Sequence, residues 1–292
     1  MRLSKKEIDR IITAALREDI GPGDVTTGAI IPMNKTGKAS FYAKEEGIIA
    51  GLFIAESVFK KSGRNIIWKN HVKEGSHVTK NRKIAEVSGS LAAILKAERT
   101  ALNLLQRLSG IATITSKFVE KAESANTKIL DTRKTVPGMR LLDKYAVKCG
   151  GGTNHRFGLY DMVLIKDNHI KIAGSIAEAV NLVRKKNKKK ILIEVETGNL
   201  NQVKEALAAK ADIIMLDNMS TQMMKEAVKI IGGKAKTEAS GNVNLKNVSK
   251  IANTGVDFIS VGALTHSVKA LDINMKISQT KALNEKINRR NK

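Results

Sequence analysis

Basic side chains gather beside glycines between residues 131 and 169. The segments that carry them read DTRKTVPG at 131–138, GGGTNHRF at 150–157 and LIKDNH at 164–169. The cations are Arg133, Lys134, Arg140, Lys144, Lys148, His155, Arg156, Lys166 and His169. On a solvated helix face, acids would alternate with these cations at a spacing of four residues, but here the acids are sparse. Arginine chelates carboxylate or phosphate and lysine adds point charge, so the pattern predicts a pocket for a small, multiply charged anion.

Two carboxylates and two glycine-containing tripeptides occur farther along the chain. SGN at 240–242 and SVG at 260–262 each combine serine with glycine, whose backbone N–H can approach an anion closely. A glycine after a strand is often only a turn, but the pair together favours a phosphate site. Glu196 and Asp217 either pair with neighbouring lysines or hold sugar hydroxyls or a Mg²⁺ that carries a diphosphate.

The elements that must position these residues form a repeat of strands and helices. Strand-like apolar runs occur at 129–131, 161–166, 191–196, 212–217, 234–240 and 256–262. Helical patterns separate the later ones at 175–187, 199–209, 220–231 and 244–253. Because no glycine-rich dinucleotide fingerprint follows the first strand, a (β/α) barrel is favoured over a doubly wound sheet. The span 110–270 is short for eight units, so we expect an open or irregular barrel of α/β class.

Polar residues fall at the carboxyl ends of six consecutive predicted strands. They are Asp131, Thr132, Arg133 and Lys134; Lys166; Glu196; Asp217; Glu238, Ser240, Gly241 and Asn242; and Ser260, Val261 and Gly262. In a (β/α) barrel those ends meet at one face, where the loops build the active site. The sequence therefore predicts that these segments form one site.

The first third of the chain predicts a separate α+β unit. Residues 4–18 read as an amphipathic helix with Ser4 as its cap, and the pattern at 91–110 reads as a helix that ends at Gly110. Short strands are expected at 38–44, 48–50 and 64–72 and twice within 72–90, with a helix at 52–61. We expect an N-terminal sandwich domain over 1–109, joined by a C-terminal helix at 271–292, and a catalytic barrel over 110–270.

Composition limits the class of protein. The net charge of +23 favours anionic partners, but scattered lysines explain most of it, and 3% aromatic residues provide few surfaces for stacking bases. The single cysteine, Cys149, fits a reducing compartment and reads as packing rather than as a nucleophile. The N-terminus lacks the apolar core of a secretion signal, and the apolar run 47–55 is too short to span a bilayer. These features predict a cytoplasmic protein with no membrane partner and no specific nucleic-acid partner.

Eight motifs together resemble one enzyme family. They are ERTALNLLQRLSGIAT at 98–113, DTRKTVPGMR at 131–140, GGTNHRFGLYD within 151–161, IKDNH at 165–169, EVE at 194–196, LDN at 216–218, EASGN at 238–242 and SVGALTHS at 260–267. The combination is similar to nicotinate-nucleotide pyrophosphorylase (carboxylating), also called quinolinate phosphoribosyltransferase. The likeness runs from about residue 5 to about residue 278, which is nearly the whole chain.

The resemblance implies a fold, a reaction and an assembly. The family joins an N-terminal α/β sandwich to an open α/β barrel. It transfers phosphoribose from 5-phosphoribosyl diphosphate to the ring nitrogen of quinolinate, and CO₂ and diphosphate leave. The product is nicotinate mononucleotide for de novo NAD biosynthesis, and Mg²⁺ is required. A homodimer or a hexamer of dimers, with an active site shared between subunits, is implied as well.

The resemblance also implies roles for individual residues. The quinolinate pocket would comprise Arg99, Arg133, His155, Arg156 and Lys166, with Arg99 supplied by the neighbouring subunit. Lys134, Glu196 and Asp217 would serve the diphosphate and its metal as the catalytic group. The 5′-phosphate would be held by Ser240, Gly241, Asn242, Ser260 and Gly262, and Thr132 and Val261 complete the candidate substrate-binding set. His155 and His169 could instead be structural.

Two other functions are compatible with parts of the sequence. A nicotinate phosphoribosyltransferase would bind a single carboxylate, for which Arg99, Arg133, Arg156 and Lys166 supply more charge than is needed. A basic nucleic-acid-binding protein would show affinity for DNA or RNA with a steep dependence on salt.

Overall fold

The structure is a computed structural model that describes residues 4–187 and 191–278. Contacts divide the described chain into two compact units. The first unit contains the described residues 4–113, 141–150 and 268–278. The second contains 114–140 and 151–267.

An antiparallel sheet forms the centre of the first unit. Its strand order is β12-β1-β5-β3, and β2 and β4 form a separate two-stranded pair. The strands are β1 (Thr36–Ala43), β2 (Gly47–Ile48), β3 (Ile67–Asn70), β4 (His77–Val78), β5 (Lys83–Ser90) and β12 (Ile273–Ser278). The helices are α1 (Lys5–Ile20), α2 (Val25–Ile30), α3 (Leu52–Ser62), the first part of α4 (Leu91–Ala122) and most of α5 (Arg140–Cys149).

Much of the chain's small aromatic content packs in this first unit. The ring of Phe41 contacts Phe59 and Trp68 at centroid distances of 5.7 and 5.3 Å, and Phe59 stacks on Trp68 at 5.6 Å. Phe41 and Phe59 have no exposed surface, so the sheet and α3 share one apolar core. The predicted helices at 4–18 and 52–61 are confirmed as α1 and α3, and the hydroxyl of Ser4 caps α1 by accepting from the N–H of Glu7 at 3.4 Å.

Three sequence predictions about this unit are wrong. The helix predicted to end at Gly110 continues to Ala122. Residues 273–278 of the predicted C-terminal helix form strand β12, which pairs with β1, and the rest of 271–292 lies outside the described residues. Residues 141–150 belong to the first unit and not, as predicted, to the barrel. The short helix α2 was not predicted.

The error at Gly110 has a clear physical cause. A Cβ atom there would lie 2.2 Å from the carbonyl oxygen of Lys269, so glycine permits the chain to pass close to the helix. A glycine inside a helix lowers helix stability by about 1 kcal/mol relative to alanine. Because glycine is therefore uncommon inside helices, a glycine in the sequence is easily interpreted as a helix end. Here the close approach of another backbone segment, rather than a helix end, accounts for the residue.

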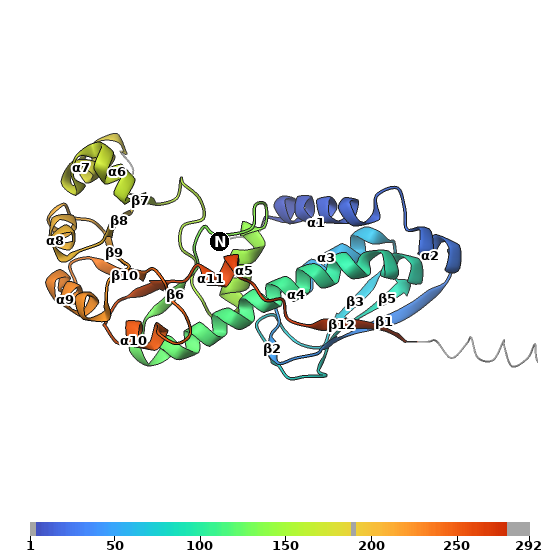
Figure 1. The fold of residues 1–292 in the computed structure, drawn as a ribbon. Helices are drawn as coiled ribbons and strands as arrows, with labels where there is room; N and C mark the ends of the chain where they lie inside the picture. The colour runs from blue at the N-terminus through green and yellow to red at the C-terminus, as the bar shows by residue number, and fades with distance from the viewer. Residues whose placement is uncertain (1–3, 188–190, 279–292) are drawn as a thin grey trace, which may run out of the picture. The chain divides into compact units, whose positions relative to one another are not determined.

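A parallel six-stranded sheet organises the second unit, in the order β6-β11-β10-β9-β8-β7. The strands are β6 (Lys128–Leu130), β7 (Val163–Ile165), β8 (Ile193–Thr197), β9 (Ile213–Asp217), β10 (Lys236–Ser240) and β11 (Phe258–Ser260). The helices are α6 (Asp167–Ala173), α7 (Ile176–Lys186), α8 (Leu200–Ala208), α9 (Thr221–Ile231), α10 (Val248–Ala252) and α11 (Ala263–His266), besides the end of α4 and the 3₁₀ turn Glu123–Ala125. Helices α6 to α9 lie along the outer side of the sheet (Figure 1).

This sheet confirms the predicted open barrel. Strands β6 and β7 are its two edges, so the ring is not closed. Ile193, Val195, Ile214, Ala239 and Ile259 have no exposed surface, as expected for parallel strands that are covered on both faces. Each of the six strands predicted after residue 110 is present, within a few residues of its predicted bounds.

The register of the parallel strands brings their carboxyl ends into line. Ser240 pairs with Asp217, Glu196 pairs with Met215, and Ser260 pairs with Leu130. Acids at the opposite ends are used differently: Asp212 accepts from the N–H of Ile193 at 2.8 Å, and Asp257 accepts from the N–H of Thr237 at 2.9 Å. The sheet therefore separates structural carboxylates at one edge from the predicted functional residues at the other.

The close approach at Gly110 predicts a large effect of one methyl group. Gly110→Ala should lower the free energy of unfolding by about 2 kcal/mol, because the clash with the Lys269 carbonyl outweighs the gain in helix propensity. Urea denaturation followed by circular dichroism measures the change. Gly28→Ala in α2 is the matched control, since a Cβ there meets nothing within 4 Å. Equal unfolding free energies for the two variants would contradict this account.

Candidate functional site

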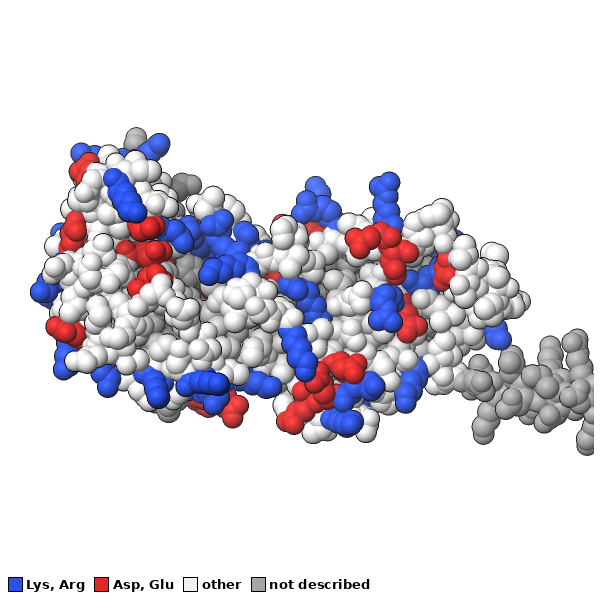
Figure 2. Space-filling view, in the orientation of Figure 1, with Lys and Arg blue, Asp and Glu red and all other residues white. Residues whose placement is uncertain are grey.

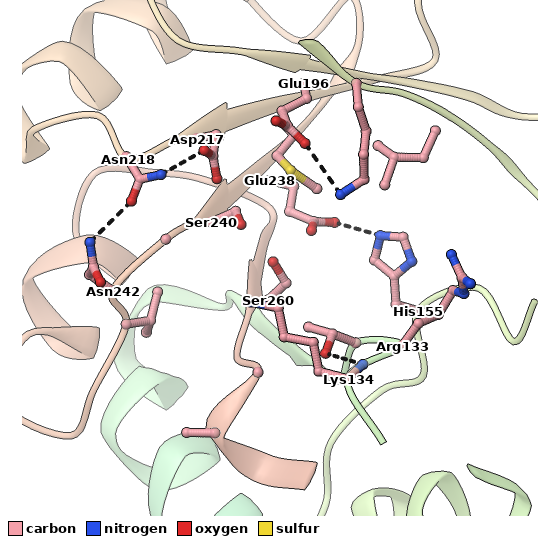
Figure 3. A pocket seen from close by; sticks show the side chains of 18 of the residues that line it. Arg133, Lys134, His155, Glu196, Asp217, Asn218, Glu238, Ser240, Asn242 and Ser260 are labelled. Atoms are coloured by element: carbon pink, nitrogen blue, oxygen red, sulfur yellow. Dashed lines mark hydrogen bonds and ion pairs between the residues drawn. The ribbon is translucent and has the colours of Figure 1, made fainter. Parts of the chain in front are cut away.

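A cavity of about 960 Å³ lies at the carboxyl ends of the strands of the second unit. Its lining comprises Thr132, Arg133, Lys134, His155, Arg156, Leu164, Lys166, Glu196, Met215, Asp217, Asn218, Glu238, Ser240, Gly241, Asn242, Val243, Ser260, Gly262, Ala263 and His266. Acidic and basic side chains face one another around this hollow (Figure 2). Figure 3 shows that the labelled residues come from several strand ends. The predicted convergence of distant segments on one site is therefore observed.

The structure brings together most of the candidate residues, with two exceptions. Val261 is buried and its N–H donates to the carbonyl of Leu130, so it supports the site without lining it. Arg99 is an exposed residue of α4 in the first unit and does not line the cavity. His169 also lies outside the lining, and its Nδ1 accepts from the N–H of Lys166 at 2.9 Å at the start of α6. This contact gives His169 a structural role at the start of α6.

Buried Asp131 holds the loop that carries His155 and Arg156. Its carboxylate accepts from the side-chain amide of Asn154 at 2.6 Å and from the N–H of His155 at 2.9 Å. Asp131 has no exposed surface, so these bonds work in a low-dielectric environment. The orientation of the predicted quinolinate loop therefore depends on Asp131, the first residue after β6.

Arg140 connects two loops that form the basic side of the cavity. Its guanidinium donates to the hydroxyl of Thr135 and to the carbonyl of Phe157, both at 3.1 Å, and to the carbonyl of Arg133 at 3.5 Å. These contacts join the loop after β6 to the loop that precedes β7. Arg140, one of the cations noted in the sequence, is therefore a structural residue here.

Arg133 and Arg156 have guanidinium groups that face the cavity. The Nε of Arg133 is buried and makes no hydrogen bond to any other part of the described chain. Burial, followed by the positive charge of Arg133, lowers the pKa of Arg156 below its ordinary value. The repulsion between the two guanidinium groups and the buried donor without a hydrogen bond are both unfavourable. An anionic ligand bound here would relieve both of them.

His155 contacts two buried carboxylates. Its Nε2 lies 3.0 Å from Oε2 of Glu194 and 3.4 Å from Oε2 of Glu238. The side chains of Glu194 and Glu238 are 0% and 1% exposed. Burial alone lowers the pKa of His155, but the two carboxylates outweigh it and raise this pKa to about 10. Burial, the largest effect, raises the pKa of Glu194 to about 7, and repulsion from Glu238 adds to it.

The protons of this trio can be assigned from its contacts. The backbone N–H of Arg156 donates to Nδ1 of His155 at 2.7 Å. Two N–H groups cannot face each other at that distance, so in this geometry Nδ1 carries no proton and Nε2–H points toward the carboxylates. A further proton is favoured on Glu194, because burial and repulsion from Glu238 raise the pKa of Glu194.

The same three side chains are of the types that ligate a transition metal. The nearby guanidinium groups of Arg133 and Arg156 disfavour the addition of a dication, because they already make this side of the cavity cationic. Protons, which carry less charge, are the better partners for the trio.

Glu196 and Asp217 lie on the acidic side of the cavity. Lys166 Nζ approaches Oε2 of Glu196 at 3.7 Å. Burial is the largest effect on Glu196, and repulsion from Asp217 adds to it, so the pKa of Glu196 is raised in spite of Lys166. A cation placed between Glu196 and Asp217 would relieve that repulsion.

Glycines at the ends of β10 and β11 allow neighbouring side chains to approach the backbone closely. A Cβ on Gly262 would lie 3.2 Å from Cδ of Lys134, and a Cβ on Gly241 would lie 2.1 Å from Oδ1 of Asn218. Gly241 has φ +97°, a conformation that side chains rarely adopt. Ser240 and Ser260 lie beside these glycines in the lining, which matches the predicted phosphate site.

Comparison with known proteins identifies the family. The model of the quinolinate phosphoribosyl transferase C-terminal domain matches residues 111–276, and that of the N-terminal domain matches residues 24–109. The chain belongs to the quinolinate phosphoribosyltransferase family. It is 47% identical to quinolinate phosphoribosyltransferase [decarboxylating] 2b, mitochondrial, of Nicotiana tabacum, over 95% of this chain and 84% of that protein. It is 45% identical to a probable nicotinate-nucleotide pyrophosphorylase [carboxylating] of Bacillus subtilis, over 93% of this chain and 94% of that protein.

Solved structures agree with this assignment. NadC from Streptococcus pyogenes superposes with a TM-score of 0.93 at 40% identity and covers 96% of this chain and 100% of its own. The nicotinate-nucleotide pyrophosphorylase from Francisella tularensis gives a TM-score of 0.90 at 42% identity, with coverage of 95% and 98%. Human nicotinic acid phosphoribosyltransferase shares only the fold, with a TM-score of 0.59 at 11% identity. The family predicted from the sequence motifs, and its fold, are thereby confirmed.

Several members of this quinolinate phosphoribosyltransferase site were absent from the sequence-based set. They are Glu194, Asn218, Val243, Ala263, His266, Leu164 and Met215. A signal for Glu194 was present, because it is an acid inside a strand that is buried on both faces. Asn218 carried a weaker signal as the amide that follows Asp217. The other five are common residue types whose position depends on tertiary packing.

The trio around His155 predicts a dependence of stability on pH. Because the pKa of Glu194 is raised to about 7 in the folded state, folding takes up a proton between about pH 4.5 and 7. The stabilisation is complete below that window and is lost as the pH rises through it. The free energy of unfolding should therefore fall by about 2 kcal/mol more in the wild type than in Glu194→Gln between pH 5 and pH 8.

Urea denaturation at several pH values measures this difference. Glu226→Gln, on an exposed position of α9, is the matched control and should follow the wild-type curve. Parallel pH curves for the wild type and Glu194→Gln would show that Glu194 takes up no proton on folding.

Proposed function

We propose that this chain transfers the phosphoribosyl group of 5-phosphoribosyl diphosphate to the ring nitrogen of quinolinate. Diphosphate and CO₂ leave, and nicotinate mononucleotide is formed for NAD biosynthesis. The observation that carries the proposal is the single cavity in which cationic groups, acids and glycine–serine loops meet. The curated relatives are named for this reaction, and the chain spans most of their length.

The basic side of the cavity suits a pyridine dicarboxylate. Quinolinate carries two neighbouring carboxylates, and Arg133 and Arg156 can each form paired hydrogen bonds with one of them. The unused Nε donor of Arg133 supports this binding mode. Lys166 adds a third charge, and the imidazole of His155 stands beside Arg156 in the lining. Thr132, whose hydroxyl accepts from the N–H of Lys134 at 3.1 Å, shapes the loop between the two substrates.

The acidic side and the glycine loops suit 5-phosphoribosyl diphosphate. Ser240, Gly241, Asn242, Ser260 and Gly262 hold the 5′-phosphate, and Lys134 neutralises the departing diphosphate. As diphosphate leaves, positive charge grows on the ribose, and the carboxylates of Glu196 and Asp217 stabilise it electrostatically. No side chain is required as a nucleophile, so positioning and preorganised charge account for the rate.

Mg²⁺ fits the acidic side of the cavity. Glu196 and Asp217 offer the carboxylate oxygens that this ion prefers, and a cation between them would relieve the repulsion of Asp217 on Glu196. We infer that these two residues hold Mg²⁺ directly, through water or through the diphosphate. The ion, when bound, neutralises charge on the diphosphate.

Loss of CO₂ follows from the first step. Ribosylation makes the ring nitrogen cationic, and this charge stabilises the carbanion that remains when the adjacent carboxylate departs as CO₂. The carbanion then takes a proton from water, which gives the C–H bond of nicotinate mononucleotide. The side chains that hold the ring, Arg133, Arg156 and Lys166, keep it oriented while CO₂ is lost.

We infer that the active unit is a homodimer, or a hexamer of dimers, in which Arg99 enters the site of the neighbouring subunit. Support comes from the exposure of Arg99 and from large apolar residues exposed in both units. Val25 and Met33 of the first unit are 87% and 94% exposed, and Tyr160 and Ile172 of the second are 75% and 88% exposed. Exposed apolar surface of this kind is typical of protein interfaces.

The location of the protein in the cell is a separate proposal. We infer a cytoplasmic location from the single cysteine, which fits a reducing compartment. Curated relatives from plants are named as mitochondrial or chloroplastic. Within the described residues, none of the helices combines the length and the apolar character needed to cross a bilayer.

The two rival functions explain fewer observations. A nicotinate phosphoribosyltransferase leaves one of the two guanidinium groups without a carboxylate, which is costly for partly buried cations. A nucleic-acid-binding protein does not require a cavity with acids on one side of it. The quinolinate reaction accounts for both the basic side and the acidic side of the cavity.

A coupled assay tests the reaction directly. Purified protein incubated with quinolinate labelled at the 2-carboxylate, 5-phosphoribosyl diphosphate and Mg²⁺ should release labelled CO₂ and nicotinate mononucleotide in equal amounts. Replacing quinolinate with nicotinate should give no product above background. Turnover of nicotinate without turnover of quinolinate would overturn the proposal.

Subunit mixing tests the shared site. Arg99→Ala and Lys134→Ala should each lower kcat/KM by about 100-fold or more, because each removes a charge from a substrate anion. Mixed under conditions in which subunits exchange, the two variants should recover up to about a quarter of wild-type activity, since hybrid dimers contain one intact site. Lys96→Ala, on the same helix, is the control and should retain wild-type activity. Absence of recovery when exchange is demonstrated would contradict a site that contains Arg99 of the neighbouring subunit.

A further inference from the structure

Side-chain amides connect the acidic side of the cavity to the glycine loop after β10. Nδ2 of Asn218 donates to Oδ2 of Asp217 at 2.6 Å, and Nδ2 of Asn242 donates to Oδ1 of Asn218 at 3.1 Å (Figure 3). The carbonyl of Asn242 accepts from the amides of Asn244 and Asn247 at 3.3 and 3.0 Å. A continuous series of hydrogen bonds therefore runs from the loop that begins α10 to the carboxylate of Asp217.

The direction of this series is fixed by the carboxylate. An ionised Asp217 can only accept, so Asn218 must present its NH₂ group to it and its oxygen to Asn242. Asn242 must in turn present its own NH₂ group. All donors therefore point toward Asp217, and hydrogen bonds aligned in this way polarise and strengthen one another. A bond to Oδ2 leaves Oδ1 of Asp217 for a hydroxyl or a cation.

The backbone holds Asn218 tightly against the loop. Its N–H donates to the carbonyl of Ser240 at 2.9 Å, and its side-chain oxygen occupies the space that a Cβ on Gly241 would need. Asn218 and Asn242 have φ of 54° and 52°, in the left-handed region that asparagine tolerates better than most residues. A displacement of Asp217 is therefore transmitted to residues 241 and 242, and the reverse also holds.

We propose that Asn218 is a positioning residue that couples the two ends of the 5-phosphoribosyl diphosphate site. Binding of the 5′-phosphate at the 240–242 loop orders Asn242, which orients Asn218 and presents Asp217 to the ribose and diphosphate end. The coupling is reciprocal, so binding at the diphosphate end orders the phosphate loop. The site thereby distinguishes an intact phosphoribosyl diphosphate from its separate fragments. This inference rests on the proposed function.

Two substitutions isolate the amide from the backbone conformation. Asn218→Gly keeps the left-handed φ and removes both hydrogen bonds. Asn218→Asp keeps the shape and replaces the donor by an acceptor beside Asp217. Asn126→Gly is the matched control, because Asn126 is an exposed residue with φ of 55° that lies outside the cavity lining. Melting temperatures of all variants report whether the fold is retained, and Asn218→Asp remains informative if Asn218→Gly is unstable.

The decisive measurement is the coupling between two probe ligands. Calorimetry gives the Kd of diphosphate with Mg²⁺ in the absence and presence of saturating ribose 5-phosphate, and the ratio of the two is the coupling factor. This factor should be about 5-fold or more larger in the wild type than in Asn218→Gly or Asn218→Asp, and unchanged in Asn126→Gly. In steady-state assays the KM for 5-phosphoribosyl diphosphate should rise by about 10-fold in both Asn218 variants, while the KM for quinolinate changes by less than about 2-fold.

Two outcomes would overturn the inference. One is a coupling factor in a folded Asn218 variant equal to that of the wild type. The other is a parallel rise of both KM values, which indicates a general distortion of the site. A wild-type protein that fails to use quinolinate with 5-phosphoribosyl diphosphate would instead refute the proposed function, so the two failures are distinguishable.

Discussion

The parallel register of the six-stranded sheet is the constraint on which the site depends. Side chains that follow each strand are placed at the same edge, because Ser240 aligns with Asp217 and Glu196 with the strand beside it. Neither the cations nor the acids could form a site alone, since a cavity lined only by one sign would repel its own members. The sheet solves this problem by placing acids on central strands and most cations on the loops near its two edges.

Charge balance within the cavity follows from that placement. The buried carboxylates of Glu194 and Glu238 lie behind His155 and partly offset the guanidinium groups beside it. A dianion that binds near Arg133 and Arg156 therefore meets hydrogen-bond donors that keep a net positive charge, although the two carboxylates reduce it. On the other side, Glu196 and Asp217 repel each other, so the site is prepared for a cation or a positively charged transition state. In the free protein, like charges repel one another on each side of the cavity. An anion bound on the basic side and a cationic group bound on the acidic side relieve this repulsion, which favours binding.

The sequence alone predicted the open barrel, its six strands and most of the cavity lining. Those successes rest on local signals: apolar runs spaced at regular intervals, and polar residues where each run ends. Errors arose where distant backbone segments decide the outcome. Gly110 looked like a helix end because its neighbour, the chain at Lys269, is remote in sequence, and residues 273–278 form a strand because β1 offers an unpaired edge. Glu194 and Asn218 were missed for the same reason, since their partners come from other strands.

A crystal structure with quinolinate and ribose 5-phosphate would test the central claim that this one cavity binds both substrates. The account predicts quinolinate between Arg133, Arg156 and Lys166, with its ring nitrogen facing C1 of the sugar, and the phosphate against Ser240 and Ser260. Such an arrangement places the reacting atoms between the cationic and acidic sides. Quinolinate bound at any other surface, or a phosphate held away from the ends of β10 and β11, would contradict it.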